Sequence, residues 1–395
     1  MRIGMILDAS FPPDPRVENE AVTLIQAGHE VFLFCFDFTG DWPQKEEING
    51  IHVRRIQPGK LTYKLSALAY TVPFYHWTLA SSLRAFIETN AVEALHIHDM
   101  QVAQGVFEVN KQFKLPVTID LHENRPEIMR YYKHVSSGMG KWLISPKAWK
   151  RNEYRFIQEA DKVVVVTDEA RDYYVEEIPV APEKFYVVPN TIREDFYTKF
   201  HRDETIISQY KDHFTLLYVG DTGYRRGLKT VIEALDLLVP SIKNLKVVIV
   251  GDSTYDDTWK QLVAESGHEA HVDLKGWQSF ELFQSYILAA DIGICPIHRN
   301  IHHDTTFANK LFQYMAFGKP IVVSDCPSQA NLVRKFNTGL VHKAQDSKGF
   351  AAQVLKLYQD KALYEQLSEN ASQATKNELN WKVLSKQIVK AYEAD

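Results

Sequence analysis

Short apolar runs alternate with amphipathic stretches along most of the chain. Five runs in the first half are rich in β-branched and aromatic residues and predict strands at 2–7, 31–36, 95–98, 117–121 and 163–167. A second series predicts strands at 215–220, 247–251, 292–296 and 321–324. Between them, apolar residues recur every three or four positions, as in the first predicted helix at Val17, Ala21, Leu24, Ile25 and Gly28. Strands that alternate with helices predict βαβ units and parallel sheets.

The two series of strands predict two domains. Between them lie the segment 187–190 and then the polar stretch 198–212, which has little hydrophobic periodicity, so we place the domain junction there. The predicted fold class is α/β, with two doubly wound, Rossmann-like domains at 1–195 and 196–375. A last segment, 376–395, contains an amphipathic helix at 381–392. If the two domains face each other, the carboxyl ends of both sheets line one cleft, where such sheets bind ligands.

Composition limits the classes of function. The 395 residues suffice for about two domains, and 45% apolar residues can fill two cores. A net charge of −5 argues against a general nucleic-acid binder, which would carry a basic domain. We expect neither a cleaved leader nor a transmembrane helix, because no uninterrupted apolar stretch approaches about eighteen residues. An odd set of cysteines in or beside strand-like runs predicts buried, reduced thiols of a cytosolic protein: Cys35, Cys295 and Cys326.

The stretch 309–320 is the most informative part of the sequence. Its apolar residues have helical spacing and would bury one face, at Leu311, Phe312, Met315 and Ala316. Thr306, Asn309 and Gln313 recur on the other face, and a glycine and a proline then end the helix. A polar stripe at the start of a helix that follows a strand is where α/β proteins hold phosphate. The alternative is a surface helix with one solvent-exposed face.

A glycine-rich turn follows the strand at 215–220 and precedes a helix. It contains three glycines and two arginines: Gly220, Gly223, Arg225, Arg226 and Gly227. In such a turn backbone N–H groups can approach a phosphate, and arginines can bind its oxygens in forked geometry. The turn matches neither the dinucleotide-binding fingerprint nor the Walker loop. The alternative is an ordinary tight turn with solvated arginines.

Histidines and carboxylates follow two strands of the first domain. His96, His98 and Asp99 end one strand, and His122 and Glu123 end another. A metal site is one interpretation, but nothing has the spacing of a known zinc site. We favour a hydrogen-bonding role for His122 at the strand end, with a purely structural histidine as the alternative.

Two loops carry further candidates. A predicted loop ahead of 309–320 could bind sugar hydroxyls or a diphosphate through His298, His302, His303 and Asp304. Its alternatives are a solvated polar loop and, less favoured, a metal site. The proline-rich turn at 11–16 opens the first helix, and its prolines fix the loop shape. We expect this turn to bring Arg16 to the mouth of the cleft.

Basic and aromatic residues concentrate in the region 125–155. They are Arg130, Tyr131, Tyr132, Lys133, Lys141, Trp142, Lys147, Trp149, Lys150, Arg151, Tyr154 and Arg155. This composition suits an anionic membrane surface or a lipid-linked acceptor. It suits equally a solvated helix whose lysines lay their apolar stems along the surface.

With these residues in view, the chain resembles a glycosyltransferase of the GT-B fold. The family is the large retaining, nucleotide-sugar-dependent family (the family four type) that includes many bacterial polysaccharide and glycolipid enzymes. The resemblance covers nearly the whole length, and 309–320 is its most specific match. The other matching stretches are 11–18, 27–31, 98–99, 120–123, 160–163, 188–190 and 381–392, the last similar to a final helix that crosses back to the first domain.

The resemblance implies roles for particular residues. Arg226 corresponds to a basic residue that contacts the donor diphosphate, and His122 to a histidine that approaches the transferred sugar; these are the expected catalytic groups. The expected donor-binding residues are Gly220, Arg225, Arg226, Asp304, Thr306, Asn309, Lys310, Leu311 and Gln313. The expected acceptor-side residues are Asp14, Arg16, His98, Asp99 and Glu123. The family generally needs no metal or other cofactor, because a helix dipole and basic side chains stabilise the leaving diphosphate.

Three positions depart from the family pattern. Asp221 stands where most members place a second phosphate-binding arginine, although Arg225 or Lys229 could compensate. Thr305 and Gln313 replace the two carboxylates of the E-x7-E motif, and Asp304 could stand in for the first. A glutamine still bonds to a ribose hydroxyl, but without the charge.

The sequence therefore predicts a cytoplasmic, metal-independent, retaining glycosyltransferase, with a peripheral position at the inner face of the cell membrane as a variant. It would move a sugar from a UDP or GDP type donor, held by the second domain, to a saccharide or lipid-linked acceptor in surface polysaccharide biosynthesis. Nucleic acid is not expected as a partner. Two alternatives remain: a degenerate GT-B protein that binds a nucleotide or partner without turnover, and a nucleotide-sugar 2-epimerase.

Overall fold

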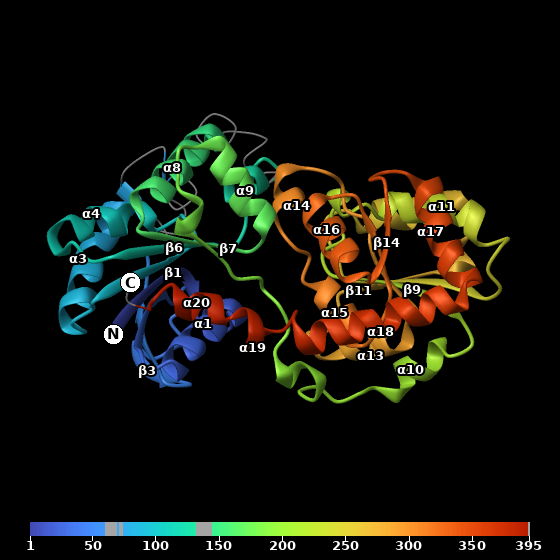
Figure 1. The fold of residues 1–395 in the computed structure, drawn as a ribbon, viewed down its shortest axis with the longest axis horizontal. Helices are drawn as coiled ribbons and strands as arrows, with labels where there is room; N and C mark the ends of the chain where they lie inside the picture. Colours follow the sequence, from blue (N-terminus) through green and yellow to red (C-terminus); the bar gives the residue numbers. More distant parts are fainter. Residues whose placement is uncertain (60–68, 71–73, 132–143, 394–395) are drawn as a thin grey trace. The chain divides into compact units, whose positions relative to one another are not determined.

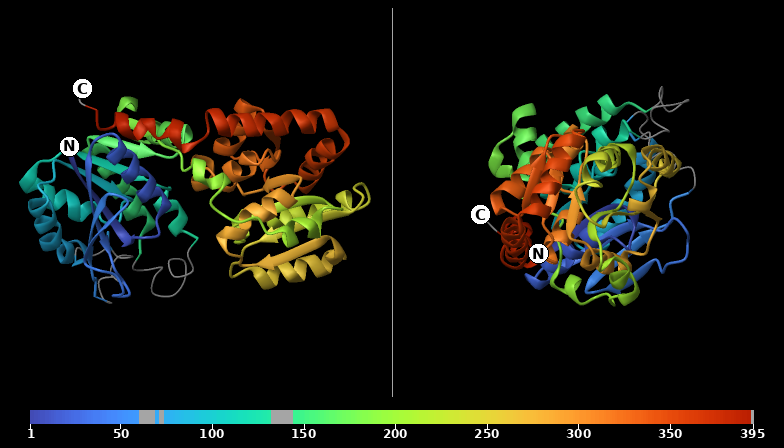
Figure 2. Two further views of the ribbon diagram at one scale, coloured as in Figure 1. Left: turned by 90° about the horizontal axis from the view of Figure 1, so that it is seen from below. Right: turned by 90° about the vertical axis from the view of Figure 1, so that its right-hand side faces the viewer.

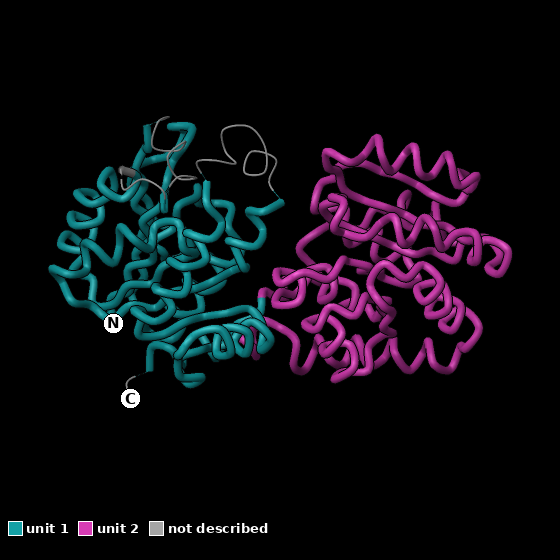
Figure 3. Tube along the Cα trace, turned by 90° about the horizontal axis from the view of Figure 1, so that it is seen from above, with its two compact units in different colours: residues 1–189, 385–395 teal, residues 190–384 magenta. Residues whose placement is uncertain are grey.

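The computed structural model describes residues 1–59, 69–70, 74–131 and 144–393, and these form two compact units. The first unit comprises residues 1–189 and 385–395, and the second comprises residues 190–384 (Figure 3). Each unit is a doubly wound α/β domain, as predicted. The expected cleft between them stays a prediction.

The described residues of the first unit form an eight-stranded sheet in the order β3-β4-β2-β1-β5-β6-β7-β8. All neighbouring strands are parallel except the β3–β4 hairpin. The strands are β1 (Arg2–Ser10), β2 (Glu30–Phe36), β3 (Lys45–Ile48), β4 (Ile51–Ile56), β5 (Ala94–His98), β6 (Val117–Leu121), β7 (Lys162–Val165) and β8 (Phe185–Val187). The helices are α1 (Pro15–Gln26), α3 (Phe74–Thr89), α4 (Ala103–Phe113), α5 (Arg125–Met129), α8 (Pro146–Glu159), α9 (Asp168–Glu177) and α20 (Lys386–Lys390).

The two faces of this sheet are covered by different helices (Figure 1). α3, α4, α8 and α9 share one hydrophobic core with alternate residues of the strands, such as Leu95 and Ile97 of β5. α1 and α20 pack together on the other face. Successive side chains of a strand point to opposite faces. His96 and His98 of β5 therefore lie on the α1 face.

The second unit has a six-stranded parallel sheet in the order β11-β10-β9-β12-β13-β14. Its strands are β9 (Phe214–Val219), β10 (Leu245–Val250), β11 (Val272–Gly276), β12 (Ile292–Cys295), β13 (Ile321–Ser324) and β14 (Gly339–His342). Its helices are α10 (Glu204–Tyr210), α11 (Leu228–Leu238), α12 (Asp256–Ser266), α13 (Phe283–Ala289), α14 (Ile301–Thr305), α15 (Lys310–Ala316), α16 (Pro327–Phe336), α17 (Ser347–Gln359), α18 (Lys361–Asn377) and α19 (Trp381–Leu384). Two hydrophobic cores lie on the two faces of this sheet, so its strands are buried on both sides.

The chain passes between units at 189/190 and again at 384/385. The predicted boundaries, 195/196 and 375/376, differ from these by six and nine residues, because Ile192, Phe196 and Leu379 pack into a core of the second unit. The amphipathic segment at 381–392 is not one helix: α19 ends at Leu384 and α20 begins at Lys386, and Figure 1 labels the two separately. Figure 2 shows the red C-terminal segment from two further directions.

Three further expectations can be compared with the structure. All nine predicted strands are present within a few residues of their expected bounds. Cys35, Cys295 and Cys326 are buried and unpaired, which confirms that part of the prediction. No helix among the described residues is long and apolar enough to cross a membrane.

Candidate active site

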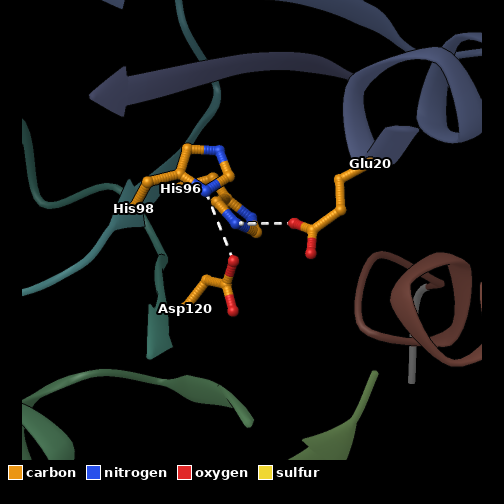
Figure 4. Close-up of side chains that lie close together, drawn as sticks. All are labelled: Glu20, His96, His98 and Asp120. Atoms are coloured by element: carbon orange, nitrogen blue, oxygen red, sulfur yellow. Dashed lines mark hydrogen bonds and ion pairs between the residues drawn. The ribbon is translucent and has the colours of Figure 1, made fainter. Parts of the chain in front are cut away.

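In the first unit, strand alternation gathers polar side chains on the α1 face of the sheet. β5 contributes His96 and His98, β6 contributes Asp120, and α1 contributes Glu20 (Figure 4). All four residues are fully buried. His96 Nε2 lies 3.3 Å from Glu20 Oε2, and His98 Nδ1 lies 3.3 Å from Asp120 Oδ2. A buried polar cluster of this kind is costly unless its members compensate one another.

Arg16 compensates both carboxylates of the cluster. Its Nε and Nη2 donate to the two oxygens of Asp120 over 2.9 and 2.6 Å, and Nη2 lies 3.0 Å from Glu20 Oε1. Its Nη1 donates to the carbonyl oxygen of Val188 over 3.0 Å. Burial opposes ionisation of Asp120, but the positive charges of Arg16 and His122 outweigh it and hold the pKa of this carboxyl well below its usual range.

His122 follows β6 directly and keeps 19% of its side chain exposed. Its Nε2 donates to Asp120 over 2.8 Å, and its Nδ1 lies 3.6 Å from Asp99 Oδ2. Its backbone N–H also donates to Asp99 over 3.2 Å. Burial lowers the pKa of His122, but the two carboxylates dominate and raise it to about 9. The ring is therefore an imidazolium at neutral pH.

His96 also connects the cluster to a residue near the end of the chain. His96 Nδ1 lies 2.7 Å from the hydroxyl oxygen of Tyr392, which follows α20. Burial lowers the pKa of His96 to about 4, so the ring is neutral. Burial raises the pKa of Glu20 to about 7 even though Arg16 acts in the opposite direction.

Glu20, His96, His98 and Asp120 are residue types that bind metals, and their candidate ligand atoms lie within 4.8 Å of one another. The position of Arg16 argues against a divalent cation in this cluster, because its guanidinium already contacts both carboxylates over 2.6–3.0 Å. A metal would have to displace this buried cation or share its ligands with it. The donor set therefore does not fit a metal while Arg16 is in place.

The expected acceptor-side residues have local partners of their own. Asp14 caps α1 by accepting from the N–H groups of Arg16 and Val17. The expectation that Arg16 reaches the cleft mouth is wrong, because the residue is only 4% exposed and its guanidinium turns onto Asp120. Glu123 pairs with Arg125 over 2.9 Å.

In the second unit, glycine is needed both in the turn between β9 and α11 and at the end of β10. Gly227 has φ +79°, and a Cβ there would lie 1.9 Å from the carbonyl oxygen of Pro296. A Cβ at Gly251 would lie 2.0 Å from the carbonyl oxygen of Gly220. The strand ends therefore pack at distances that only glycine allows. This edge lies at the topological switch point, where β9 pairs with β12.

Two cations converge at this switch point. Arg226 comes from the turn after β9, and Lys310 begins α15. The Lys310 ammonium lies 3.5 Å from the centroid of the Tyr218 ring and also lies beside Gly220. Burial lowers the pKa of Lys310 to about 7, opposed by Cys295 and assisted by the charge of Arg226. Two cations close together in a partly buried site form an anion-binding arrangement.

Asp221 competes for one of these cations. Its Oδ2 accepts from Nε of Arg226 over 2.7 Å, and its Oδ1 accepts from the N–H of Gly223 over 3.0 Å. On the other side, Arg226 Nη1 lies 3.4 Å from Nε2 of His303. An incoming diphosphate would share Arg226 with Asp221.

The helix of the stretch 309–320 begins close to its expected start, because α15 starts at Lys310 with Asn309 as its N-cap residue. Thr306 is the C-cap residue of α14 and lies outside α15. Its hydroxyl donates to the carbonyl oxygen of His302 over 2.6 Å, so the three-membered polar stripe is wrong at its first member. Leu311 is buried in the core, and its N–H donates to the carbonyl oxygen of Ala308. Gln313 is partly exposed on α15.

The histidine cluster ahead of this helix is not a solvated loop. Residues 301–305 form the short helix α14, and His302 and His303 are buried. Asp304 forms a two-point ion pair with Arg299 over 2.8 and 3.0 Å. Asp304 therefore already has a cationic partner at the position where it was expected to replace a lost family carboxylate.

The basic and aromatic region 125–155 is partly packed inward. Trp149 is 2% exposed, and Lys150 pairs with Glu153 over 2.7 Å. Tyr131 is 52% exposed. The members at 132–143 lie outside the described residues.

Sequence reasoning did not single out Asp120, Glu20 or Trp277 as site residues. Asp120 and Glu20 look like any polar residue of a strand and a helix until Arg16 joins them. Trp277 follows β11 at the carboxyl edge of the second sheet and is 71% exposed. Large exposed aromatic side chains at such an edge are a signal of ligand contact that the sequence does contain.

Comparison with known families covers nearly the whole chain. Residues 13–191 match the family described as Glycosyl transferase 4-like domain, and residues 201–374 match Glycosyl transferases group 1. Taken together, the two matched domains identify the chain as a glycosyltransferase of the family four type. This confirms the predicted family and the prediction of a glycosyltransferase activity.

Similar proteins agree with this glycosyltransferase assignment. An uncharacterized glycosyltransferase of Methanocaldococcus jannaschii is 20% identical over 93% of this chain and 90% of its own. Sucrose-phosphate synthase from Thermosynechococcus elongatus superposes with a TM-score of 0.78 at 18% identity, over 99% of this chain and 98% of that one. Anabaena HepE in complex with UDP superposes with a TM-score of 0.71 at 14% identity, over 99% of both chains. These structures show the GT-B fold, as predicted.

Proposed function

We propose that this glycosyltransferase moves a sugar from a nucleoside-diphosphate donor to a saccharide or lipid-linked acceptor, with retention at the anomeric carbon and without a metal. Surface polysaccharide assembly is the proposed setting. UDP and GDP sugars are the first donors to test, and UDP is the nucleotide bound by the Anabaena relative.

The convergence of Arg226 and Lys310 at the switch point of the second sheet carries this proposal. The leaving diphosphate gains negative charge as the bond between the anomeric carbon and the diphosphate oxygen breaks. Preorganised cations stabilise that charge more than they stabilise the ground state. The low pKa of Lys310 fits this role, since a buried ammonium without a full counter-charge is stabilised by an anion.

The nucleoside would extend from these cations along the same sheet edge. The exposed ring of Trp277 after β11 offers a stacking surface for a base. Gln313 of α15 would bond to the ribose hydroxyls in place of the family glutamate. Neither contact involves a residue needed for the core.

In the first unit, His122 would approach the transferred sugar. Its ring is partly exposed at the carboxyl end of β6, and Asp120 and Asp99 hold it on both sides. The two cations of the second unit, and the contact of Arg16 with both carboxylates of its cluster, support metal-independent transfer.

The test is turnover of a panel of UDP and GDP sugars in excess EDTA, read as release of the nucleoside diphosphate. NMR of the product then gives the configuration at the anomeric carbon. Release with EDTA and a retained configuration supports the proposal. A strict metal requirement or an inverted product contradicts the corresponding part, and epimerisation of the donor without an acceptor supports the 2-epimerase alternative.

The Asp221–Arg226 pair favours a second candidate, a protein that binds a nucleotide without turnover. The carboxylate lies 2.7 Å from the cation that the leaving diphosphate needs. In that case nucleotides bind, but no donor of the panel is consumed.

A further inference from the structure

His122 is held between two carboxylates from different elements. Its Nε2 lies 2.8 Å from Asp120 on β6, and its Nδ1 lies 3.6 Å from Asp99 after β5. A neutral imidazole carries only one N–H, so carboxylates at both ring nitrogens favour the imidazolium. The contact with Asp120 is the shorter of the two and holds the orientation of the ring more firmly.

The position of Asp120 depends in turn on Arg16. The guanidinium donates to both oxygens of the carboxylate in a forked contact. This contact fixes the plane of the carboxylate as well as its distance from Arg16. Arg16 itself has little freedom, because Nη1 is tied to Val188 and Nη2 to Glu20. The side chain is only 4% exposed, so these partners enclose it.

We propose that Arg16 is a positioning residue for sugar transfer: its forked contact holds the Asp120 carboxylate against Nε2 of His122 and so sets the ring that meets the transferred sugar. This inference rests on the proposed function, in which His122 approaches the sugar. Arg16 acts through Asp120 and touches no reacting atom.

The charged and titratable groups that act on the His122 ring come from several elements. They are Asp8 of β1, Arg16 and Glu20 of α1, His96 and His98 of β5, Asp99 after β5, Asp120 of β6, and Glu123 after it, which itself pairs with Arg125. The carboxylates raise the pKa of His122 to about 9, whereas the charge of Arg16 by itself lowers it. Arg16 therefore has two effects of opposite sign: direct repulsion, and support of the Asp120 contact.

The test is an NMR titration of the His122 ring in the full-length protein without substrate, comparing wild type with Arg16→Gln. If Arg16 positions Asp120, its loss frees the carboxylate and the pKa of His122 falls by about 1 unit or more. If Arg16 is only a neighbouring charge, its loss removes a repulsion and the pKa of His122 rises. A rise or no change overturns the proposal. Arg16→Lys keeps the charge and lacks the fork, so it should give a smaller fall and serves if Arg16→Gln does not fold.

Kinetics link this titration to transfer. Arg16→Gln should lower kcat by about tenfold or more with little change in KM for the donor, and Arg84→Gln, on the exposed side of α3, should change neither. His122→Ala separates the two claims. If His122→Ala keeps full turnover, the proposed role of His122 fails. If His122→Ala loses turnover while Arg16→Gln keeps it, the positioning role of Arg16 is contradicted.

Discussion

The ammonium group of Lys310 lies 3.5 Å from the centroid of the Tyr218 ring, at the carboxyl end of the second sheet. An aromatic face attracts a cation, but it does not replace a counter-ion. Burial accordingly lowers the pKa of Lys310 to about 7. The site is ready for an anion whose charge would restore the protonated form.

We therefore predict that nucleoside-diphosphate binding takes up a proton above neutral pH. Free Lys310 is largely neutral at pH 8, and a bound diphosphate raises its pKa, so binding at pH 8 takes up close to one proton. At pH 6 the group is already protonated, and its uptake approaches zero. Calorimetry in two buffers of different ionisation enthalpy measures this number. Lys310→Gln should abolish the difference between pH 6 and pH 8, and uptake that persists in this variant would assign it to another group.

Asp221 should weaken donor binding. Its carboxylate is 47% exposed and lies 2.7 Å from Nε of Arg226, so it repels a diphosphate and competes for the same cation. We expect Asp221→Asn to tighten nucleoside-diphosphate binding by about two- to fivefold, the size of a partly exposed ion pair. Asp236→Asn, a substitution of an exposed carboxylate on α11, is the matched control. Weaker binding by Asp221→Asn would show that the carboxylate orients Arg226 instead of competing with the ligand.

Arg226 should matter more to turnover than to folding. Loss of one preorganised charge that stabilises the leaving group costs about 10²–10³ in rate, so Arg226→Ala should lower kcat by two or more decades. Arg334→Ala, in the last turn of α16, should retain full turnover. An Arg226→Ala variant with near-normal kcat would remove this residue from the mechanism.

Gly227 should be needed for the fold of the donor turn. At φ +79° a side chain is strained, and its Cβ would also lie 1.9 Å from the carbonyl oxygen of Pro296. We expect Gly227→Ala to lower the free energy of unfolding by about 2 kcal/mol or more. Gly267 has φ +70° and open space around its Cβ, so Gly267→Ala should cost only the backbone strain, about 1 kcal/mol. Urea unfolding compares the two, and equal losses would contradict the role of the Pro296 contact.

The sequence predicted strands where they are buried on both faces and missed those where they are not. β9, β10 and β13 are continuous apolar runs between two layers of helices, which makes them easy to recognise. β4 carries Arg54 and Arg55, and β11 carries Asp273 and Lys275, so their hydrophobic pattern is weak. Both lie toward the edges of their sheets, where charged side chains are tolerated.

The candidate site was predictable only as far as strand ends define it. His98, Asp99 and His122 could be grouped because they end neighbouring parallel strands. The inward turn of Arg16 could not, because its partner Asp120 is 104 residues away in the sequence. The place of Thr306 outside α15 was missed because its hydroxyl bonds to the preceding turn, a local hydrogen bond that periodicity does not reveal.

The most direct test of the central claim is calorimetric binding of UDP and GDP in EDTA to wild type, Arg226→Ala and Lys310→Gln. The account predicts micromolar binding of one nucleotide to the wild type and at least tenfold weaker binding to each variant. Binding that requires a divalent metal, or that is unchanged in both variants, would contradict a donor site built on these two cations.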